Sequence, residues 1–463
     1  MAAIALSALI ILASFTSSQL INPTVSAADP EPANDWPMFH HDPLHRGAGT
    51  GDPALTPTLL WNYTTGFMVE SSPAVVDGVV YIGSEDGNVY ALNADSGTKI
   101  WSYTTGNLPT AQTSGLPFLP QNGVGSSPAV VNGVVYVGAL DSNVYALNAA
   151  NGNRLWNYTT GYIINSNPIV INGIVYVGSL DNNIYALDAV TGNQLWNFTT
   201  NGPVYSSPAV VNDVVYIGSV DGNVYALSAA DGTKIWNYTT EVTSWIDHNA
   251  VESSPSVVGG VVYVGSGNYN VYALKSADGA KLWGYTTGGE VNSSPAVANG
   301  IVYVGSNDGN VYALSVSSGD KIWSYTTDMS SLSGNAVYSS PAVVGGIVYV
   351  GSFGGGVYAL NASNGNKIWN YTTVIAAISR SFYSGNQLIG SISYTGNQVG
   401  SSPAVVDGVV YIGSYDGTVY ALGSPVPSPP FSTLLGIAVV LVAAAIVGTG
   451  LLIYYKKRKH ERM

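Results

Sequence analysis

Short runs of apolar and β-branched residues alternate with turn-forming pairs along most of the chain. In the first complete copy of this pattern, the runs are Pro73–Val76, Val79–Ser84, Asn88–Asn93 and Lys99–Thr104, and pairs such as Asp77-Gly78 separate them. These pairs supply the positive φ angles of tight hairpins, and residues of the intervening type suit half-buried strands. Each copy therefore predicts four short antiparallel strands.

A Ser-Ser-Pro-Ala-Val-Val motif, with variations, opens every copy. The eight copies begin at Ser71, Ser126, Ser166, Ser206, Ser253, Ser293, Ser339 and Ser401. Three of the intervals are 40 residues and the others are longer, which fits a blade-sized period with insertions in some connections. The sequence thus predicts an all-β fold, an eight-bladed β-propeller.

The fourth strand of a copy carries a tryptophan at a fixed place. These residues are Trp101, Trp156, Trp196, Trp236, Trp283, Trp323 and Trp369. The eighth copy ends before its fourth strand, whereas Trp61 stands in an orphan strand upstream of the first copy. We therefore expect Thr58–Thr65 to complete the eighth blade, which closes the ring and leaves no exposed sheet edge.

Apolar segments near both ends of the sequence predict export and insertion into a membrane. An apolar run at Ile4–Ala13 precedes Val25-Ser26-Ala27, a small-x-small pattern of signal-peptide cleavage, so residues 1–27 are predicted to be a signal peptide. No Lys or Arg precedes the run, so the alternatives are a misplaced start codon or an uncleaved anchor. Residues 431–455 carry no charge and are long enough to cross a hydrocarbon core of about 30 Å.

A basic cluster, Lys456-Lys457-Arg458-Lys459, follows the apolar span, and the positive-inside rule places it in the cytoplasm. The expected order is a lead-in segment at 28–57, the propeller at 58–422, a Pro-rich linker at 423–430, a transmembrane helix at 431–455 and a cytoplasmic tail at 456–463. The protein is thus predicted to lie in the cell membrane as a single-pass protein with its propeller outside.

Composition removes several classes of function. The chain has no cysteine, which excludes disulfides, thiolate metal sites and cysteine nucleophiles. Its formal net charge is −13, with no basic stripe interleaved with aromatic residues, so nucleic acid is not expected as a partner.

A spacing of Ala, Gly and Trp, as in Ala91, Gly97 and Trp101, recurs in seven copies. It resembles the tryptophan-docking repeat of the pyrroloquinoline-quinone (PQQ)-like propeller superfamily. The resemblance implies that each indole stacks between neighbouring blades and that the small residues make room for it. Trp61 is expected to act in the same way, and the segment from Trp36 to Asp42 looks like the lead-in of such proteins.

In the quinoprotein dehydrogenases of this superfamily, the cofactor lies on the axis beneath a disulfide, beside a calcium ion held by acidic and amide side chains. Because this chain has no cysteine and lacks their large insertions, we expect no cofactor and no enzymatic activity. A PQQ-dependent dehydrogenase remains one alternative. An envelope-assembly scaffold is another, since the resemblance extends to propeller lipoproteins that help to assemble bacterial outer-membrane proteins.

Two sets of polar residues could bind metal but have simpler explanations. His40, His41, Asp42 and His45 are close in sequence, yet consecutive side chains of an extended chain point in opposite directions, so no metal is assigned. Aspartates recur at the second turn of the repeat and could form a cation-binding ring, although Asp before Gly or Asn is ordinary turn chemistry. They are Asp86, Asp141, Asp181, Asp221, Asp308 and Asp416.

The insertions share one position in the repeat. Leu108–Val124, Glu241–Val251, Asp328–Val337 and Val374–Val399 all connect a fourth strand to the next first strand, and alternating strand direction puts these connections on the face of the second-to-third turns. Loops on a rigid scaffold commonly carry recognition, although neutral loop growth would leave the same pattern. The candidate binding-face residues are Phe118, Trp245, His248, Arg380, Phe382 and Tyr383.

Seven Asn-x-Ser/Thr sequons indicate a glycoprotein, in keeping with an archaeal cell surface, although repetition of one strand would generate most of them without any sugar. They begin at Asn62, Asn157, Asn197, Asn237, Asn292, Asn361 and Asn370. The leading hypothesis is a membrane-anchored extracellular propeller that acts as a binding or scaffold module for a protein or glycan at the cell surface. The sequence does not indicate the oligomeric state.

Overall fold

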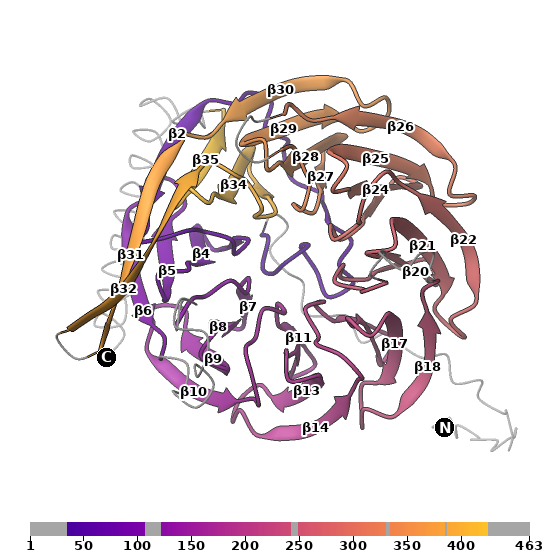
Figure 1. Cartoon of the computed structure of the whole chain (residues 1–463), viewed down its shortest axis with the longest axis horizontal. Coiled ribbons are helices and arrows are strands. Elements are labelled where there is room, and N and C mark those ends of the chain that lie inside the picture. The colour runs from indigo at the N-terminus through magenta and orange to yellow at the C-terminus, as the bar shows by residue number, and fades with distance from the viewer. Residues whose placement is uncertain (1–34, 107–121, 242–248, 330–333, 385–386, 425–463) are drawn as a thin grey trace, which may run out of the picture.

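The computed structural model describes residues 35–106, 122–241, 249–329, 334–384 and 387–424. Eight blades, each with four antiparallel strands, surround a central axis; in each blade the first strand lies nearest the axis and the fourth strand lies at the rim (Figure 1). The predicted eight-bladed, all-β propeller is confirmed.

The strand bounds repeat from blade to blade. From the axis outward, the first blade is β3 Ala74–Val76, β4 Val79–Gly83, β5 Asn88–Asn93 and β6 Lys99–Thr104; the second is β7 Ala129–Val131, β8 Val134–Gly138, β9 Asn143–Asn148 and β10 Arg154–Thr159; the third is β11 Ile169–Ile171, β12 Ile174–Gly178, β13 Asn183–Asp188 and β14 Gln194–Thr199; the fourth is β15 Ala209–Val211, β16 Val214–Gly218, β17 Asn223–Ser228 and β18 Lys234–Thr239. The fifth is β19 Ser256–Val258, β20 Val261–Gly265, β21 Asn270–Lys275 and β22 Lys281–Thr286; the sixth is β23 Ala296–Ala298, β24 Ile301–Gly305, β25 Asn310–Ser315 and β26 Lys321–Thr326; the seventh is β27 Ala342–Val344, β28 Ile347–Gly351, β29 Gly356–Asn361 and β30 Lys367–Thr372.

The eighth blade is built from both ends of the propeller. It consists of β33 Ala404–Val406, β34 Val409–Gly413, β35 Thr418–Gly423 and, at the rim, β2 Leu59–Thr64. β2 pairs antiparallel with β35, with Trp61 opposite Ala421. The prediction that the N-terminal strand closes the ring is therefore confirmed.

Each indole joins its blade to the next one. The eight Nε1 atoms donate to main-chain oxygens at distances of 2.7–3.0 Å, and the acceptors are Ala94, Ala149, Ala189, Ala229, Ser276, Val316, Ala362 and Ala54. Seven of these acceptors lie in the turn between the third and fourth strands of the following blade. Trp369 instead bonds to Ala54, so the lead-in provides the turn that the eighth blade lacks.

Gly97 shows why the repeat needs glycine after the third strand. Its φ is +68°, in the left-handed region, and a Cβ atom there would lie 2.5 Å from the Trp61 ring. A larger residue would therefore both strain the turn and push the indole off its acceptor. The same contact recurs between Gly152 and Trp101.

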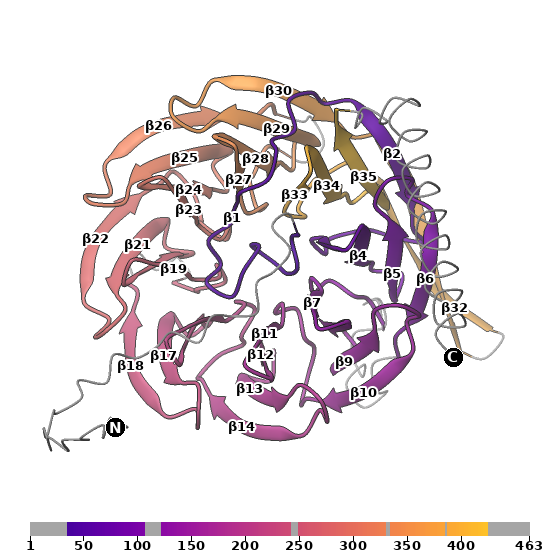
Figure 2. The ribbon, with the colours of Figure 1, turned by 180° about the vertical axis from the view of Figure 1, so that it is seen from behind.

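The lead-in also crosses the axis on one face, where we call residues 36–49 the strap (Figure 2). Its carbonyl oxygens accept 2.8–2.9 Å hydrogen bonds from the inner-edge N–H groups of six blades, and the donors are Val75, Val130, Val210, Val257, Val297 and Val343. At its end, β1 Ala48–Gly49 pairs parallel with β27. Backbone donors that would otherwise face the channel are thus satisfied.

One insertion forms regular structure of its own. Between the seventh and eighth blades, β31 Ala376–Ser384 and β32 Gln387–Gly396 form an antiparallel hairpin. It lies on the face opposite the strap, in front of the ring in Figure 1 and behind it in Figure 2.

Within the described ranges, the structure has no helix that is long and apolar enough to cross a membrane. The predicted span at 431–455, the signal peptide at 1–27 and the basic tail lie outside these ranges.

We expect Trp61→Ala to destabilise the full-length protein as much as Trp196→Ala, because both indoles are 8% exposed and both bond to the next blade. Loss of a buried Trp typically costs about 3–5 kcal/mol, and thermal unfolding would show it as a lower midpoint. An unchanged midpoint for Trp61→Ala beside a lowered one for Trp196→Ala would contradict the closure of the ring by β2.

Candidate functional site in the axial channel

A closed ring of hydrogen bonds surrounds the axis near the mouth of the channel. In each blade, the residue before the motif proline donates its backbone N–H to the side-chain oxygen of its counterpart in the next blade, at 2.6–3.0 Å. This inner ring is formed by Ser72, Ser127, Asn167, Ser207, Ser254, Ser294, Ser340 and Ser402. Because each serine oxygen already accepts an N–H, its own hydrogen is left to donate into the channel.

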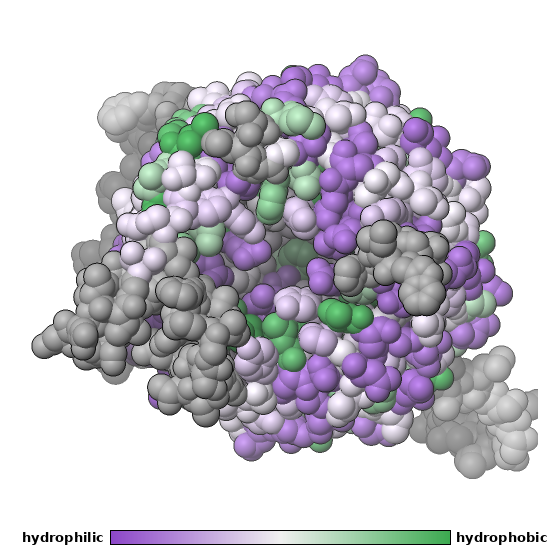
Figure 3. All heavy atoms as spheres, viewed as in Figure 1, coloured by the Kyte–Doolittle hydropathy of each residue, from purple (hydrophilic) through white to green (hydrophobic). Residues whose placement is uncertain are grey.

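The channel holds a cavity of about 200 Å³. The inner ring forms its wall, Phe39 of the strap lies at its closed end, and the other end opens on the face of the β31–β32 hairpin. Figure 3 shows the hollow at the centre of this face, with polar residues around much of its rim.

An outer ring of residues surrounds the mouth of the cavity, one from each blade, directly before each serine pair. Its members are Glu70, Gly125, Asn165, Tyr205, Glu252, Asn292, Tyr338 and Gly400. Glu70 and Glu252 belong to the first and fifth blades and therefore lie on opposite sides of the eight-fold ring. Asn165 Oδ1 is buried and has no hydrogen-bond donor among the described residues.

Aromatic side chains continue outward from this mouth across the seventh and eighth blades. Ring centroids are 4.5 Å apart between Tyr338 and Phe353, 5.4 Å between Phe353 and Tyr415, and 6.0 Å between Tyr415 and Tyr394. Tyr394 belongs to β32, so this aromatic strip links the channel to the hairpin. The Tyr415 hydroxyl donates to Glu70 at 2.9 Å, and the protein atoms packed around this carboxyl raise its pKa by desolvation although part of the side chain faces the open channel.

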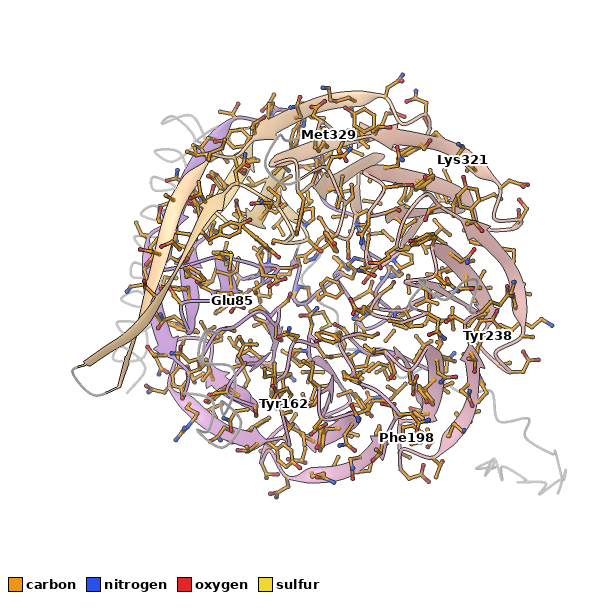
Figure 4. All side chains as sticks on the ribbon, in the orientation of Figure 1. Glu85, Tyr162, Phe198, Tyr238, Lys321 and Met329 are labelled. Atoms are coloured by element: carbon orange, nitrogen blue, oxygen red, sulfur yellow. The ribbon has the colours of Figure 1, made fainter. Side chains whose placement is uncertain are left out.

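The aromatic strip differs in its contacts from the aromatic residues of the outermost strands. Figure 4 labels Phe198 and Tyr238 at the rim, whereas Glu85 lies nearer the axis. Phe198 packs on Tyr225 of the next blade at 5.4 Å, and Tyr238 packs on Tyr272 at 5.5 Å. These rim pairs bind blade to blade, whereas the aromatic strip begins at Tyr338, which lines the open cavity.

Two buried histidines hold the strap below the cavity. His40 Nδ1 lies 3.3 Å from the main-chain oxygen of His45, and His45 Nδ1 lies 3.2 Å from that of Pro255. Burial lowers the pKa of His40 to about 4. Burial and the neighbouring His40 lower the pKa of His45 to about 3. Asp42 accepts from Leu44 and pairs with Arg46 at 2.6 Å, so each of these polar groups serves the fold of the strap.

The turn aspartates also hold structure together. In six blades the Asp accepts from a Tyr hydroxyl four residues ahead and from a turn N–H; Asp86, for example, bonds to Tyr90 at 2.7 Å and to Asn88 at 2.9 Å. Asn268 replaces the Asp in the fifth blade and bonds to Tyr272. In the seventh blade, Asp328 of the preceding connection bonds to Tyr358 instead. These bonds account for the recurrence through turn chemistry rather than through a cation.

The predicted binding-face residues do not all fall in the described part of the chain. Phe118, Trp245 and His248 lie outside it. Arg380, Phe382 and Tyr383 belong to β31, on the face of the channel mouth. The alternation of strand direction does put the fourth-to-first connections on the face of the second-to-third turns, because Asp86 Oδ2 accepts the N–H of Gly66 at 2.7 Å.

The sequons occupy different settings. Asn62, Asn157, Asn197 and Asn237 are exposed on outermost strands. Asn292 lines the channel mouth. Asn361 uses its side-chain oxygen to accept from the turn that follows β29, and Asn370 lies partly exposed in β30.

Sequence reasoning missed the outer ring as a site. The sequence does contain a signal for this ring. In each copy one residue lies between a Val or Ile and the Ser-Ser or Ser-Asn pair, and this residue changes from copy to copy while its neighbours hardly change. Those neighbours, such as Val69 and Val251, are fully buried. The variable residue is the one the fold leaves free to face the channel.

The cavity does not fit the quinone of related propellers. PQQ carries three carboxylates, whereas the cavity lining contains two carboxylates, Glu70 and Glu252, and no lysine or arginine among the residues that line it. Its volume also falls below the roughly 300–1,000 Å³ of typical ligand pockets.

Comparison with known proteins places this architecture in context. The family profile described as outer membrane protein assembly factor BamB matches residues 54–162, 162–245 and 242–425. BamB of Salmonella typhimurium is 37% identical over 107 residues, which make up 22% of this chain and 26% of that protein. Quinohemoprotein alcohol dehydrogenase of Comamonas testosteroni is 35% identical over 106 residues, 22% of this chain and 14% of that protein.

Solved structures show the same fold. BamB from Moraxella catarrhalis has a TM-score of 0.62 at 18% identity, covering 79% of this chain and 99% of its own. A europium-containing methanol dehydrogenase has a TM-score of 0.66 at 14% identity, covering 85% and 98%. The sequence matches span about a quarter or less of the curated relatives, so they carry over no activity or partner.

We expect the free energy of unfolding to decrease as the pH falls from about 6.5 towards 4. The unfolded chain protonates both histidines below a pKa near 6.5, whereas the folded chain keeps His40 and His45 neutral until about pH 4 and 3. Each histidine then contributes a slope of about 1.4 kcal/mol per pH unit.

Denaturant titration of the full-length protein at pH 7, 6 and 5 measures this slope. His45→Gln should reduce this slope by about half, because His40 keeps its own contribution. A slope equal in His45→Gln and the unaltered protein would contradict the assignment to the strap.

Proposed function

This chain belongs to the family described as outer membrane protein assembly factor BamB, a family of PQQ-like repeat propellers, and we propose that it is a non-enzymatic binding scaffold. In this proposal the propeller stands outside the cell, residues 431–455 anchor it in the membrane, and its partner is a protein or glycan of the cell surface. The BamB relatives are described as assembly factors, which supports a scaffold.

One observation carries the proposal: the two faces of the ring are built differently. On one face the strap pairs with six blades and lies across the channel. On the other face the channel opens beside the aromatic strip and the β31–β32 hairpin. A ligand therefore finds the polar cavity, the half-exposed aromatic rings and the β31–β32 hairpin on a single face, which we call the mouth face.

The lining of the channel supports binding over catalysis. Its inner ring is neutral, and each oxygen in that ring is already engaged by a backbone N–H from the neighbouring blade. The two carboxylates stand in different blades on opposite sides of the axis. Such an array can hold a polar ligand but offers no activated nucleophile with an adjacent base.

Photocrosslinking tests which face is used. A photoreactive phenylalanine at position 394, in β32, should crosslink to a partner in native membranes. The same residue at position 190, a site 83% exposed in the turn between β13 and β14, should not, because that turn lies on the strap face. Mass spectrometry reads the products, and equal crosslinking from both positions would refute the assignment to the mouth face.

A further inference from the structure

We propose that the axial cavity binds the terminal sugar residue of a neutral glycan, with the aromatic strip supporting the sugar units that follow. This inference rests on the proposed function and adds the chemical class of the ligand and the place where it binds. The inner and outer rings of the cavity offer different hydrogen-bonding groups at different depths.

The inner ring offers donors. Its seven serine oxygens accept backbone N–H groups, so the hydroxyl hydrogens remain for a ligand, and Asn167 likewise uses its Oδ1 and keeps its NH₂ group. A ligand that reaches this depth must therefore accept hydrogen bonds. Ammonium and guanidinium groups have no acceptor, so the ring disfavours a lysine or arginine side chain.

The outer ring offers acceptors. Glu70 and Glu252 present carboxylates from opposite sides, and Asn165 Oδ1 is buried without a donor in the described structure. A ligand at the mouth must therefore donate hydrogen bonds. An anionic group is disfavoured, because two carboxylates and no lysine or arginine line the cavity.

A neutral polyhydroxyl group satisfies both rings, since every hydroxyl donates once and accepts twice. The volume of about 200 Å³ suits one compact ring rather than a drug-sized molecule. Phe39 at the closed end and the half-exposed Tyr205 and Tyr338 at the mouth provide apolar surfaces for the C–H faces of a pyranose.

The aromatic strip indicates the direction in which a bound glycan would leave the cavity. From Tyr338 the rings of Phe353, Tyr415 and Tyr394 follow at 4.5–6.0 Å spacings, so a chain that leaves the cavity meets a continuous apolar surface as far as β32. Tyr415 also positions Glu70 through its 2.9 Å hydrogen bond. The cavity and the strip thus form one site.

The test uses the full-length protein in lipid nanodiscs without glycolipid, because detergents with sugar headgroups would compete. The probes are the methyl glycosides of glucose, mannose, galactose and N-acetylglucosamine, together with a trisaccharide that ends in the tightest of them. Calorimetry and saturation-transfer NMR should detect at least one glycoside, and its own trisaccharide should bind more tightly.

Three variants, each checked for an unchanged melting temperature, separate the parts of the site. Glu252→Gln should weaken the glycoside about tenfold or more, because a charged acceptor is lost. Phe353→Leu should weaken the trisaccharide and leave the glycoside unchanged. Glu241→Gln is the matched control and should change neither, since Glu241 is exposed and pairs with Lys281 at 2.8 Å away from the cavity.

Other outcomes would overturn the inference. If no glycoside binds while position 394 still crosslinks to an unglycosylated protein, a glycan is not the ligand, but the proposed function as a binding scaffold is supported. If neither is seen, both proposals fall. If N-acetylarginine methylamide binds in a Glu252-dependent way and the sugars do not, the cavity accepts a basic side chain instead.

Discussion

The contact between each indole and the following blade is the interaction on which the ring depends. A four-stranded blade cannot bury both of its faces alone, and the gap between twisted blades widens towards the rim, where a large flat side chain fills it. The Nε1 hydrogen bond then fixes the angle between the blades. Ala54 accepts this bond from Trp369 although it lies before the first blade, so the last joint uses the same chemistry as the others. Near the axis, the ring of serine oxygens repeats this head-to-tail arrangement at a smaller radius.

The indole contacts fix the blades near the rim, and the ring of serine oxygens fixes them near the axis. The residues that differ from blade to blade therefore lie at the ends of the channel. The strap completes the backbone pairing of the inner edge at one end and brings Phe39 under the cavity. At the other end, one residue per blade is held between a buried Val or Ile and a hydrogen-bonded serine, with its side chain free to differ. The scaffold can therefore change what it presents at the mouth without changing its core.

The repeat made most of the fold predictable. The strands Asn88–Asn93 and Lys99–Thr104 were predicted with their observed bounds, because turn residues lie on both sides of each strand. The closing strand was predicted because Trp61 lies in a Trp-bearing strand that belongs to no complete copy, while the eighth copy lacks such a strand. The strap was not predicted, since its bonds come from main-chain oxygens of unlike residues such as Pro43 and Arg46. Glu70 and Glu252 look unrelated in the sequence, and only closure of the ring sets them face to face. The β31–β32 hairpin lies in an insertion where no strand was predicted.

The position of the strap and of β2 at the start of the chain has a consequence for the order of assembly. Both segments precede the first blade in the sequence, yet their partners include β27 of the seventh blade and β35 of the eighth. β2 must therefore wait in an unpaired state until the eighth repeat arrives, and an arc of fewer than eight blades leaves this strand without its partner. Closure of the ring is thus the slow, long-range step expected of a fold in which β2 must meet β35.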